Sequence, residues 1–457
     1  MSPGPRIESL DGFCFGRAPR PVRCGHGLVL GEGEVVPEIN YTLPPMAITE
    51  ASWAQVRGEY QQMVDAVLTR AVELQSPSLL VEFETLPDMT QRPQWGLKIC
   101  RLLADALARA HETHGLRCAL RFTPNDTREF ERPPRMRGGR HWDDMQEIFA
   151  SAAEAGADLV AIESTGGKEV GDEALMTGDL KLMVFALGVL GAHDMTFLWR
   201  QIVAACQGTS LVPSGDSACG FANTAMVLAD RRMISRVFAA VVRVASVPRS
   251  LVAFEQGARG PSKDCAYEGP YLKAMAGVPI AMEGRTAACA HLSPVGNISQ
   301  AVCDCWSNES VQNVQLLSGK APVASLEQLV YDCRLMNTAS AGTPEDARRL
   351  RDWLTESDAK HDPQAWVLRP DVVLRIARRI EARPTAYPRT REAVLATLDE
   401  LSRAHAEGSL ALARRELSWL ERLRAEAEQL PEQEAELIDE ILGSGSTPPF
   451  RREEYGL

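Results

Sequence analysis

The sequence lacks long apolar runs and an excess of basic residues. Its 457 residues contain 61 Asp and Glu against 49 Lys and Arg, which gives a formal net charge of -12. Unaided binding of nucleic acid normally needs a basic surface, so this charge argues against that class of function. The longest uninterrupted apolar stretch, near residues 182–192, is too short to cross a bilayer. We therefore expect a soluble protein that binds neither nucleic acid nor a membrane.

The sequence also shows no secretory segment. Its start, MSPGPRIESLDGFCFGR, contains no apolar stretch of signal-peptide length, which predicts a cytoplasmic location. Disulfides are rare in that compartment. We therefore expect most of the 11 cysteines, including Cys303 and Cys305, to be small buried hydrophobic residues.

Common cofactor-binding motifs are absent as well. No GxGxxG turn follows the first predicted strand, and there is no GxxxxGK(S/T) loop. There is no CxxC pair and no HExxH, so local spacing does not indicate a metal. Any functional site must therefore be assembled from residues that lie far apart in the chain.

What the sequence does contain is a repeated alternation of strand-like and helical segments. Apolar runs such as SLLVEFET, LRCALRFT, ADLVAIES, RSLVAFEQ and VPIAM are expected to be strands, and the segments between several of them have helical spacing. This order predicts a parallel α/β architecture. About 300 residues of such units suit a (β/α)8 TIM-type barrel, with an open doubly wound sheet as the competing fold.

Composition divides the chain into three parts. Residues 1–45 are rich in Gly and Pro and are expected to form an N-terminal arm packed on the barrel. Residues 46–340 are expected to form the catalytic barrel. Residues 341–457 show helical periodicity without strand signals, which predicts a helical C-terminal extension.

Polar residues follow several predicted strands, where a barrel places its active site. Glu163 follows the apolar run LVAI, Cys219 lies shortly after SLV, and Cys265 lies in the loop after LVAF. Two thiolates and a carboxylate would hold zinc and leave a fourth position open. Each residue is weak evidence alone, because a glutamate at a strand end often caps a helix or pairs with a lysine. Composition and spacing thus leave the metal site a hypothesis.

A collinear series of motifs strengthens that hypothesis. The stretches ADLVAIESTGGKEV, GDSACGFANTAM, VPRSLVAFEQGARGPSKDCAYEG, MEGRTAACAH and CDCWSNES run through the chain in one order. They resemble the zinc-containing subunit of methanol:corrinoid protein methyltransferases, and the similarity covers nearly the whole chain. The resemblance implies a barrel with added helices in which Glu163, Cys219 and Cys265 hold the zinc.

The resemblance also implies a reaction. Zinc would activate methanol, and its methyl group would pass to a Co(I) corrinoid. The chain lacks DxHxxG, the usual cobalt-binding signature, so the corrinoid is expected on a partner corrinoid-binding protein, in a hetero-oligomer or beside a homo-oligomer of this chain. The alternatives are another small O-methyl or methylated donor, a zinc-dependent hydrolase or lyase on the same barrel, and a binding scaffold without turnover.

Three further residues are candidates for catalytic support. Lys168, five residues after Glu163, is a candidate to offset negative charge, although a solvent-facing lysine is the commoner case. Asp216 is a candidate to orient a ligand or relay a proton, with a helix N-cap as an equal alternative. His291 is a third candidate, although a histidine held by loop contacts is more common.

Three residues are candidates to line the substrate pocket. Asn223 falls four residues after Cys219 on the same helix face, and Tyr267 is near Cys265. Phe122 ends the strand CALRF, at a position where the resembling family has histidine. That difference, together with a poor match in the segment after Ser310, leaves another methyl donor open.

Overall fold

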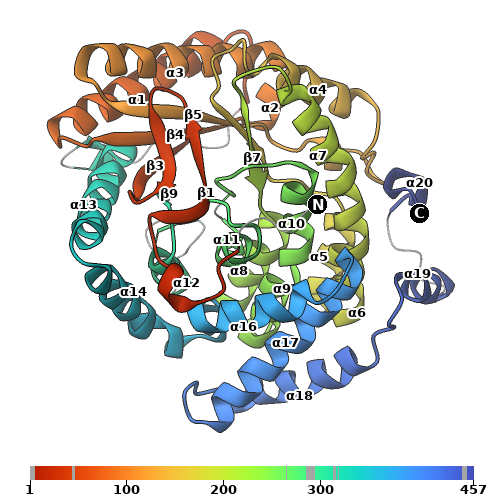
Figure 1. Ribbon diagram of the computed structural model, residues 1–457. Coiled ribbons are helices and arrows are strands. Elements are labelled where there is room, and N and C mark those ends of the chain that lie inside the picture. Colours follow the sequence, from red (N-terminus) through yellow and green to blue (C-terminus); the bar gives the residue numbers. More distant parts are fainter. Residues whose placement is uncertain are drawn as a thin grey trace.

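A parallel β-sheet of seven strands forms the centre of the molecule (Figure 1). The computed structural model describes residues 6–43, 47–263, 265–284, 294–311, 315–316, 319–444 and 450–457. The strand order is β7-β6-β5-β4-β3-β9-β8, so that the first and last strands of the alternating region are neighbours. These strands are β3 (Val36–Thr42), β4 (Ser78–Glu84), β5 (Arg117–Thr123), β6 (Leu159–Ile162), β7 (Val212–Asp216), β8 (Ala281–Glu283) and β9 (Cys305–Val311).

Residues 259–262 close this sheet into a barrel. The backbone N–H of Gly260 donates to the carbonyl of Ser214 in β7 at 2.8 Å, and Ser262 pairs in parallel with Ile280 beside β8. The segment therefore fills the position between the two edge strands, and eight parallel segments surround the barrel axis. The predicted (β/α)8 TIM-type barrel is confirmed.

One predicted strand is wrong. The segment RSLVAFEQ lies in helix α10 (Val247–Gln256), whose first eight residues are all buried. A helix that is buried on every side carries a continuous apolar run, which periodicity alone does not distinguish from a buried strand. The strand at this point of the barrel is the less apolar segment that follows, residues 259–262.

Helices cover the outside of the barrel (Figure 1). In α1 (Trp53–Glu73) the apolar residues with helical spacing, such as Val56, Tyr60 and Met63, are the buried ones. Other helices that follow strands are α3 (Pro93–His114), α4 (Arg140–Ser151), α5 (Lys168–Thr177), α7 (Ala192–Cys206), α11 (Gly269–Ala276) and α13 (Ala321–Ala341).

An N-terminal hairpin closes one end of the barrel. Strands β1 (Arg17–Cys24) and β2 (Leu28–Glu32) pair antiparallel. Their buried side chains form one apolar cluster with residues from seven barrel strands, namely Val22, Cys24, Leu28, Leu30, Val36, Leu80, Ala119, Leu159, Val212, Ala281 and Cys305. The arm therefore ends before Val36, and the predicted boundary at residue 45 wrongly assigned strand β3 to it.

The described part of the chain after residue 341 contains helices and no strand. The main helices are α14 (Pro344–Asp358), α16 (Pro370–Glu381), α17 (Ala386–Ala406), α18 (Arg414–Glu428) and α19 (Glu434–Gly443). Helix α17 packs on α10 and on α9 (Arg236–Ala245) of the barrel. A separate domain boundary at residue 341 stays a prediction.

Two helical stretches are as long and apolar as a membrane span. They are Leu180–Cys206 and Arg236–Gln256, and 78% and 100% of their most apolar windows are buried inside the fold. The core of a large protein needs helices of the same composition. Their packing in this barrel therefore accounts for their apolar character.

Candidate metal centre

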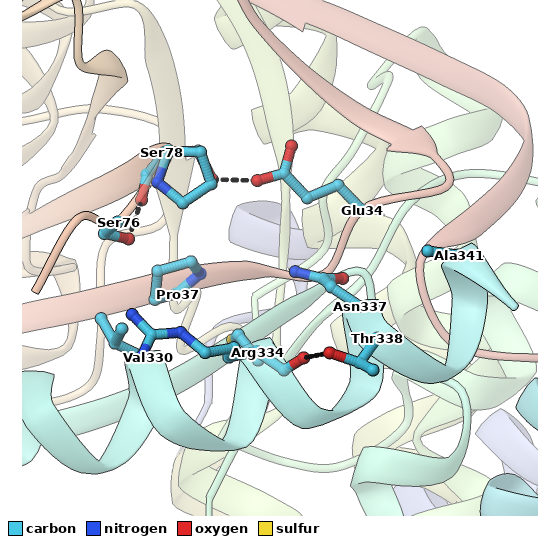
Figure 2. Close-up of a pocket in the computed structure, with 11 residues that line it drawn as sticks. Glu34, Pro37, Ser76, Ser78, Val330, Arg334, Asn337, Thr338 and Ala341 are labelled. Carbon is cyan, nitrogen blue, oxygen red and sulfur yellow. Dashed lines mark hydrogen bonds between the residues drawn. The ribbon is translucent and has the colours of Figure 1, made fainter.

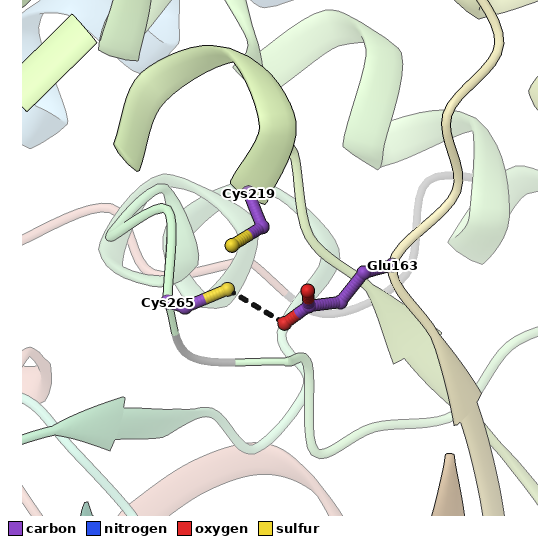
Figure 3. Close-up of side chains that lie close together, drawn as sticks. All are labelled: Glu163, Cys219 and Cys265. Carbon is purple, nitrogen blue, oxygen red and sulfur yellow. Dashed lines mark hydrogen bonds between the residues drawn. The ribbon is translucent and has the colours of Figure 1, made fainter. Parts of the chain in front are cut away.

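The three residues predicted to bind metal converge at one end of the barrel. Glu163 follows β6, Cys219 begins a π-helical turn after β7, and Cys265 follows the segment that closes the barrel. Their ligand atoms lie within 4.8 Å of one another (Figure 3). The Cys265 Sγ is 2.8 Å from Glu163 Oε1. Because the strands are parallel, their C-terminal ends meet at the same rim, which is where barrels carry active sites.

The donor set fits zinc. Zinc binds sulfur and carboxylate oxygen at about 2.0–2.3 Å in tetrahedral geometry, which separates ligand atoms by roughly 3–4 Å. Cys265 is buried, whereas Glu163 and Cys219 are partly exposed, so the group is open on one side. A site with three protein ligands and access from solvent has the form of a catalytic zinc site.

The two thiols are protonated without a cation. A hydrogen bond with Cys265 lowers the pKa of Cys219, but burial and the charge of Glu163 outweigh it and raise that pKa to about 11. Burial, together with Cys219 and Glu163, raises the pKa of the Cys265 thiol well above its usual range. Thiolate ligands therefore require a bound cation here, which couples metal binding to proton release.

Lys263 supplies positive charge beside the site. This buried side chain places its Nζ 2.6 Å from Glu82 Oε1, 2.5 Å from Glu84 Oε1 and 3.7 Å from Glu163 Oε1. Burial opposes ionisation of Glu82, but Lys263 and Arg121 hold its pKa below the usual value. Burial raises the pKa of Glu84 well above the usual range against the pull of Lys263. The ammonium group thus joins one metal-ligand candidate to two carboxyl groups of the barrel interior.

Lys168 pairs with other carboxylates, and its role in offsetting charge at the metal stays a prediction. Its Nζ lies 2.6 Å from Asp172 and 3.9 Å from Glu129, and its side chain is partly exposed. Asp172 lies one helical turn after Lys168 on α5, which places the two side chains on the same face. Sequence reasoning missed Lys263, although it stands two residues before Cys265 in the motif SKDC.

Asp216 supports the Glu163 loop and does not contact the three ligand atoms directly in the described structure. Its carboxylate accepts from the backbone N–H of Ser164 at 3.1 Å and from Trp199 Nε1 at 2.9 Å, and Arg249 lies 3.7 Å away. Burial raises the pKa of Asp216, and Arg249 opposes that rise. The N-cap alternative is not what the structure shows, because Asp216 ends β7 and binds the residue after Glu163.

Asn223 lies beside the metal centre. Its Nδ2 is 3.7 Å from Cys219 Sγ, as expected for residues one turn apart on a helical face. Tyr267 is buried and faces the Arg243 guanidinium, whose carbon is 5.4 Å from the ring centroid. A pocket-lining role stays a prediction for both residues.

Phe122 does not line the site, and that prediction is wrong. Its ring stacks on Phe83 with centroids 5.5 Å apart and lies 3.7 Å from the position of a Cβ on Gly96 of α3. Side chains alternate along a strand. The neighbouring residues Arg121 and Thr123 contact interior glutamates, so Phe122 points outward into the helix layer.

The other residues singled out from the sequence divide into two groups. Cys303 and Cys305 are buried free thiols, which confirms the packing role expected of them. His291 lies outside the described residues, as do residues 312–314 and 317–318 of the segment after Ser310.

A hollow in the fold lies away from this rim. Its volume is about 290 Å³, and it is lined by the loop before β3, the start of β4 and helix α13 (Figure 2). Glu34, Ser78 and Asn337 in its wall already hydrogen-bond within the protein, since Ser78 Oγ donates to Glu34 and Asn337 Oδ1 accepts from Val35 N–H. These polar groups are therefore committed to the fold, and the hollow gives no sign of a ligand site.

A parallel barrel with a carboxylate and two thiols at the C-terminal ends of its strands defines a barrel enzyme with a candidate metal centre at its mouth. The family model for the methanol-cobalamin methyltransferase B subunit matches residues 6–456. The chain therefore belongs to this family.

Individual relatives agree with the family match. The methanol–corrinoid protein co-methyltransferase of Methanosarcina barkeri (strain Fusaro / DSM 804) is 36% identical over 454 residues, which covers 98% of this chain and 97% of that protein. The crystal structure of the methanol:cobalamin methyltransferase complex MtaBC from Methanosarcina barkeri contains a chain that matches with a TM-score of 0.94 at 35% identity, over 99% of this chain and 100% of that one. The similarity therefore extends over the complete fold.

Proposed function

We propose that this chain transfers the methyl group of methanol to the Co(I) corrinoid of a separate corrinoid protein, using zinc held by Glu163, Cys219 and Cys265. The observation that carries the proposal is the convergence of these three residues at the barrel mouth. The names of the relatives, a methanol–corrinoid protein co-methyltransferase and a methanol:cobalamin methyltransferase complex, support the substrate and the partner. A cytoplasmic location and assembly with the corrinoid protein belong to the same proposal.

The chemistry explains why such a site is needed. The methyl carbon of methanol carries a poor leaving group, because hydroxide is a strong base. Bound zinc supplies a Lewis acid that stabilises the negative charge developing on the alcohol oxygen. The oxygen must also gain a proton in order to leave as water, so the net reaction consumes one proton for each methyl group transferred.

The protein supplies position and charge. Two thiolates and a carboxylate give a zinc site a formal charge of -1, which reduces the acidity of the metal. Lys263, 3.7 Å from Glu163, places positive charge beside that ligand and offsets part of its negative charge. Asp216 and Arg249 both hydrogen-bond to the backbone of Ser164, the next residue in the chain. The backbone beside Glu163, the candidate ligand that follows β6, is thus held in place before substrate binds.

Methanol is the donor that we propose. The sequence left other donors open mainly because Phe122 replaces a histidine, and that residue packs outside the barrel. The difference at Phe122 therefore carries no argument about substrate. A hydrolase or lyase would act without a corrinoid partner, which separates it from the proposed function by experiment.

An absorbance assay tests the proposal. A reduced corrinoid protein is mixed with the zinc-loaded protein and with methanol or another methyl donor, and conversion of Co(I) to methyl-Co(III) is followed. We expect conversion with methanol, and none when Cys265→Ser replaces the wild type. Conversion only with another donor would reject methanol. Turnover of a donor without corrinoid would favour a hydrolase or lyase, and partner binding without conversion would favour a scaffold.

A further inference from the structure

Successive residues of the loop after Glu163 each contact a different buried group. The N–H and Oγ1 of Thr165 both donate to Asp126 Oδ2, at 2.9 and 3.1 Å. Arg128 binds Asp126 and Asp194 together, at 2.7 and 2.8 Å, with all three side chains fully buried. Gly166 packs so closely on Asp194 that a Cβ would lie 2.4 Å from its side chain. Thr165 and Gly166 are therefore held in place by the buried ion pairs of Asp126, Arg128 and Asp194.

The far end of the loop is held by a residue from the other end of the chain. The Tyr455 hydroxyl accepts from the backbone N–H of Gly167 at 2.9 Å and lies 3.1 Å from Glu169 Oε1, to which it donates. Gly167 is the residue before helix α5 and has φ +82, a left-handed conformation that favours glycine. An N–H at a helix start has no partner within the helix, so the tyrosine satisfies a group that would otherwise be unpaired.

Tyr455 is itself held in place from several directions. Its ring is fully buried and lies 6.0 Å from the Phe450 ring, which in turn lies 5.6 Å from the Phe185 ring. The Tyr455 carbonyl accepts from Arg137 Nη2 at 2.7 Å, and Glu454 Oε2 accepts from the Arg137 N–H at 2.9 Å. These contacts do not involve the Glu163 loop, so they place the hydroxyl independently of it.

We propose that residues 450–457 act as a latch on the metal-ligand loop and that Tyr455 is a positioning residue for Glu163. The inference rests on the proposed metal site. Ser164 and Thr165 are held by Asp216 and Asp126, whereas Gly167 is held by Tyr455. Removing the last contact frees the end of the loop that leads into α5. The Glu163 carboxylate then samples more positions, and the three-ligand site loses preorganisation.

Tyr455→Phe tests the latch, with Tyr387→Phe as the matched control. Both tyrosines are buried and both use the hydroxyl in one hydrogen bond to backbone, but Tyr387 donates to the Pro431 carbonyl in the helical extension. Zinc affinity is measured by competition with a chromophoric chelator. Loss of one buried hydrogen bond predicts a roughly five- to tenfold weaker zinc affinity for Tyr455→Phe and no change for Tyr387→Phe.

Hydrogen exchange supplies a readout that does not depend on the metal. In the metal-free protein, amides of residues 163–170 should exchange at least about threefold faster in Tyr455→Phe than in Tyr387→Phe, because the Gly167 N–H loses its acceptor. Should Tyr455→Phe fail to fold, Arg137→Ala removes a contact that places Tyr455 and leaves residues 163–170 unaltered, and faster exchange of the same segment is again expected.

Two results would overturn the latch. One is equal exchange and equal zinc affinity in Tyr455→Phe and the wild type. The other is an equal loss of affinity in Tyr455→Phe and Tyr387→Phe, which would indicate general destabilisation. A wild-type protein that binds no zinc would reject the proposed function instead, and the exchange measurement would still decide whether Tyr455 holds the loop.

Discussion

Replacing Lys263 by Met should destabilise the protein strongly. The substitution keeps the length of the side chain but leaves the buried Glu82 carboxylate without its ion-pair partner. Lys263 is 1% exposed and contacts Glu82 and Glu84 at 2.6 and 2.5 Å. Glu82 is fully buried and its pKa is held below the usual value by Lys263 and Arg121, so the group that loses its partner is a buried carboxylate. Breaking one buried ion pair costs about 3–5 kcal/mol, and that is the loss in unfolding free energy that we expect near neutral pH.

Urea unfolding followed by circular dichroism measures this loss, with Lys168→Met as the control. Lys168 has the same chemistry and pairs with Asp172 at 2.6 Å, but its side chain is 24% exposed. A pair of that kind contributes about 1 kcal/mol or less. Equal losses in the two variants, or a loss below about 1 kcal/mol in Lys263→Met, would refute the reasoning that Lys263 balances a buried carboxylate.

The pH dependence of the difference in unfolding free energy between wild type and Lys263→Met gives an independent check. The folded pKa of Glu82 is lowered, so its ion pair contributes stability above the ordinary pKa of a glutamate and loses it as pH falls through the folded value. In Lys263→Met the uncovered carboxyl can take up a proton instead. The difference between wild type and variant should therefore be largest near pH 8 and shrink as pH falls toward about 5.

Two further predictions concern Glu169 and Phe122. Burial raises the folded pKa of Glu169 to about 7, so its stabilising contribution falls as pH rises from the ordinary glutamate value through about 7. Glu169→Gln should remove that pH dependence and raise the unfolding free energy at about pH 8 by as much as about 3 kcal/mol. Urea unfolding at two pH values measures this, and an unchanged pH dependence would contradict the raised pKa of Glu169. Phe122→His should destabilise the barrel by roughly 2–3 kcal/mol through lost ring packing and a buried polar group, and leave the ratio of rates with methanol and other donors unchanged. A changed donor ratio in the corrinoid absorbance assay would return Phe122 to the substrate pocket.

The barrel could be predicted from the sequence because its strands and helices alternate with clear periodicity. The convergence of Glu163, Cys219 and Cys265 could also be predicted, because barrel topology brings strand ends together. Sequence reasoning failed for RSLVAFEQ, where a fully buried helix is as apolar as a strand. It also assigned β3 to the arm, because Gly and Pro in the hairpin conceal where the barrel begins.

The supporting residues of the site were harder to predict. Strand alternation around Phe122 carries the needed signal, since the polar neighbours Arg121 and Thr123 must face the interior of a barrel whose outer wall packs against helices. Lys263 has no local pattern that distinguishes it from Lys168. Tyr455 contacts Gly167 across 288 positions of sequence, and no spacing rule connects residues that far apart.

The zinc content of wild type and single-cysteine variants tests the central claim most directly. Cys219→Ser and Cys265→Ser are compared with Cys303→Ser, which replaces a buried cysteine outside the site. Elemental analysis of purified, folded protein should give about one zinc per chain for the wild type and for Cys303→Ser, and little or none for the other two variants. Full zinc content in Cys219→Ser and Cys265→Ser, or equal loss in all three, would contradict a zinc site built from Glu163, Cys219 and Cys265.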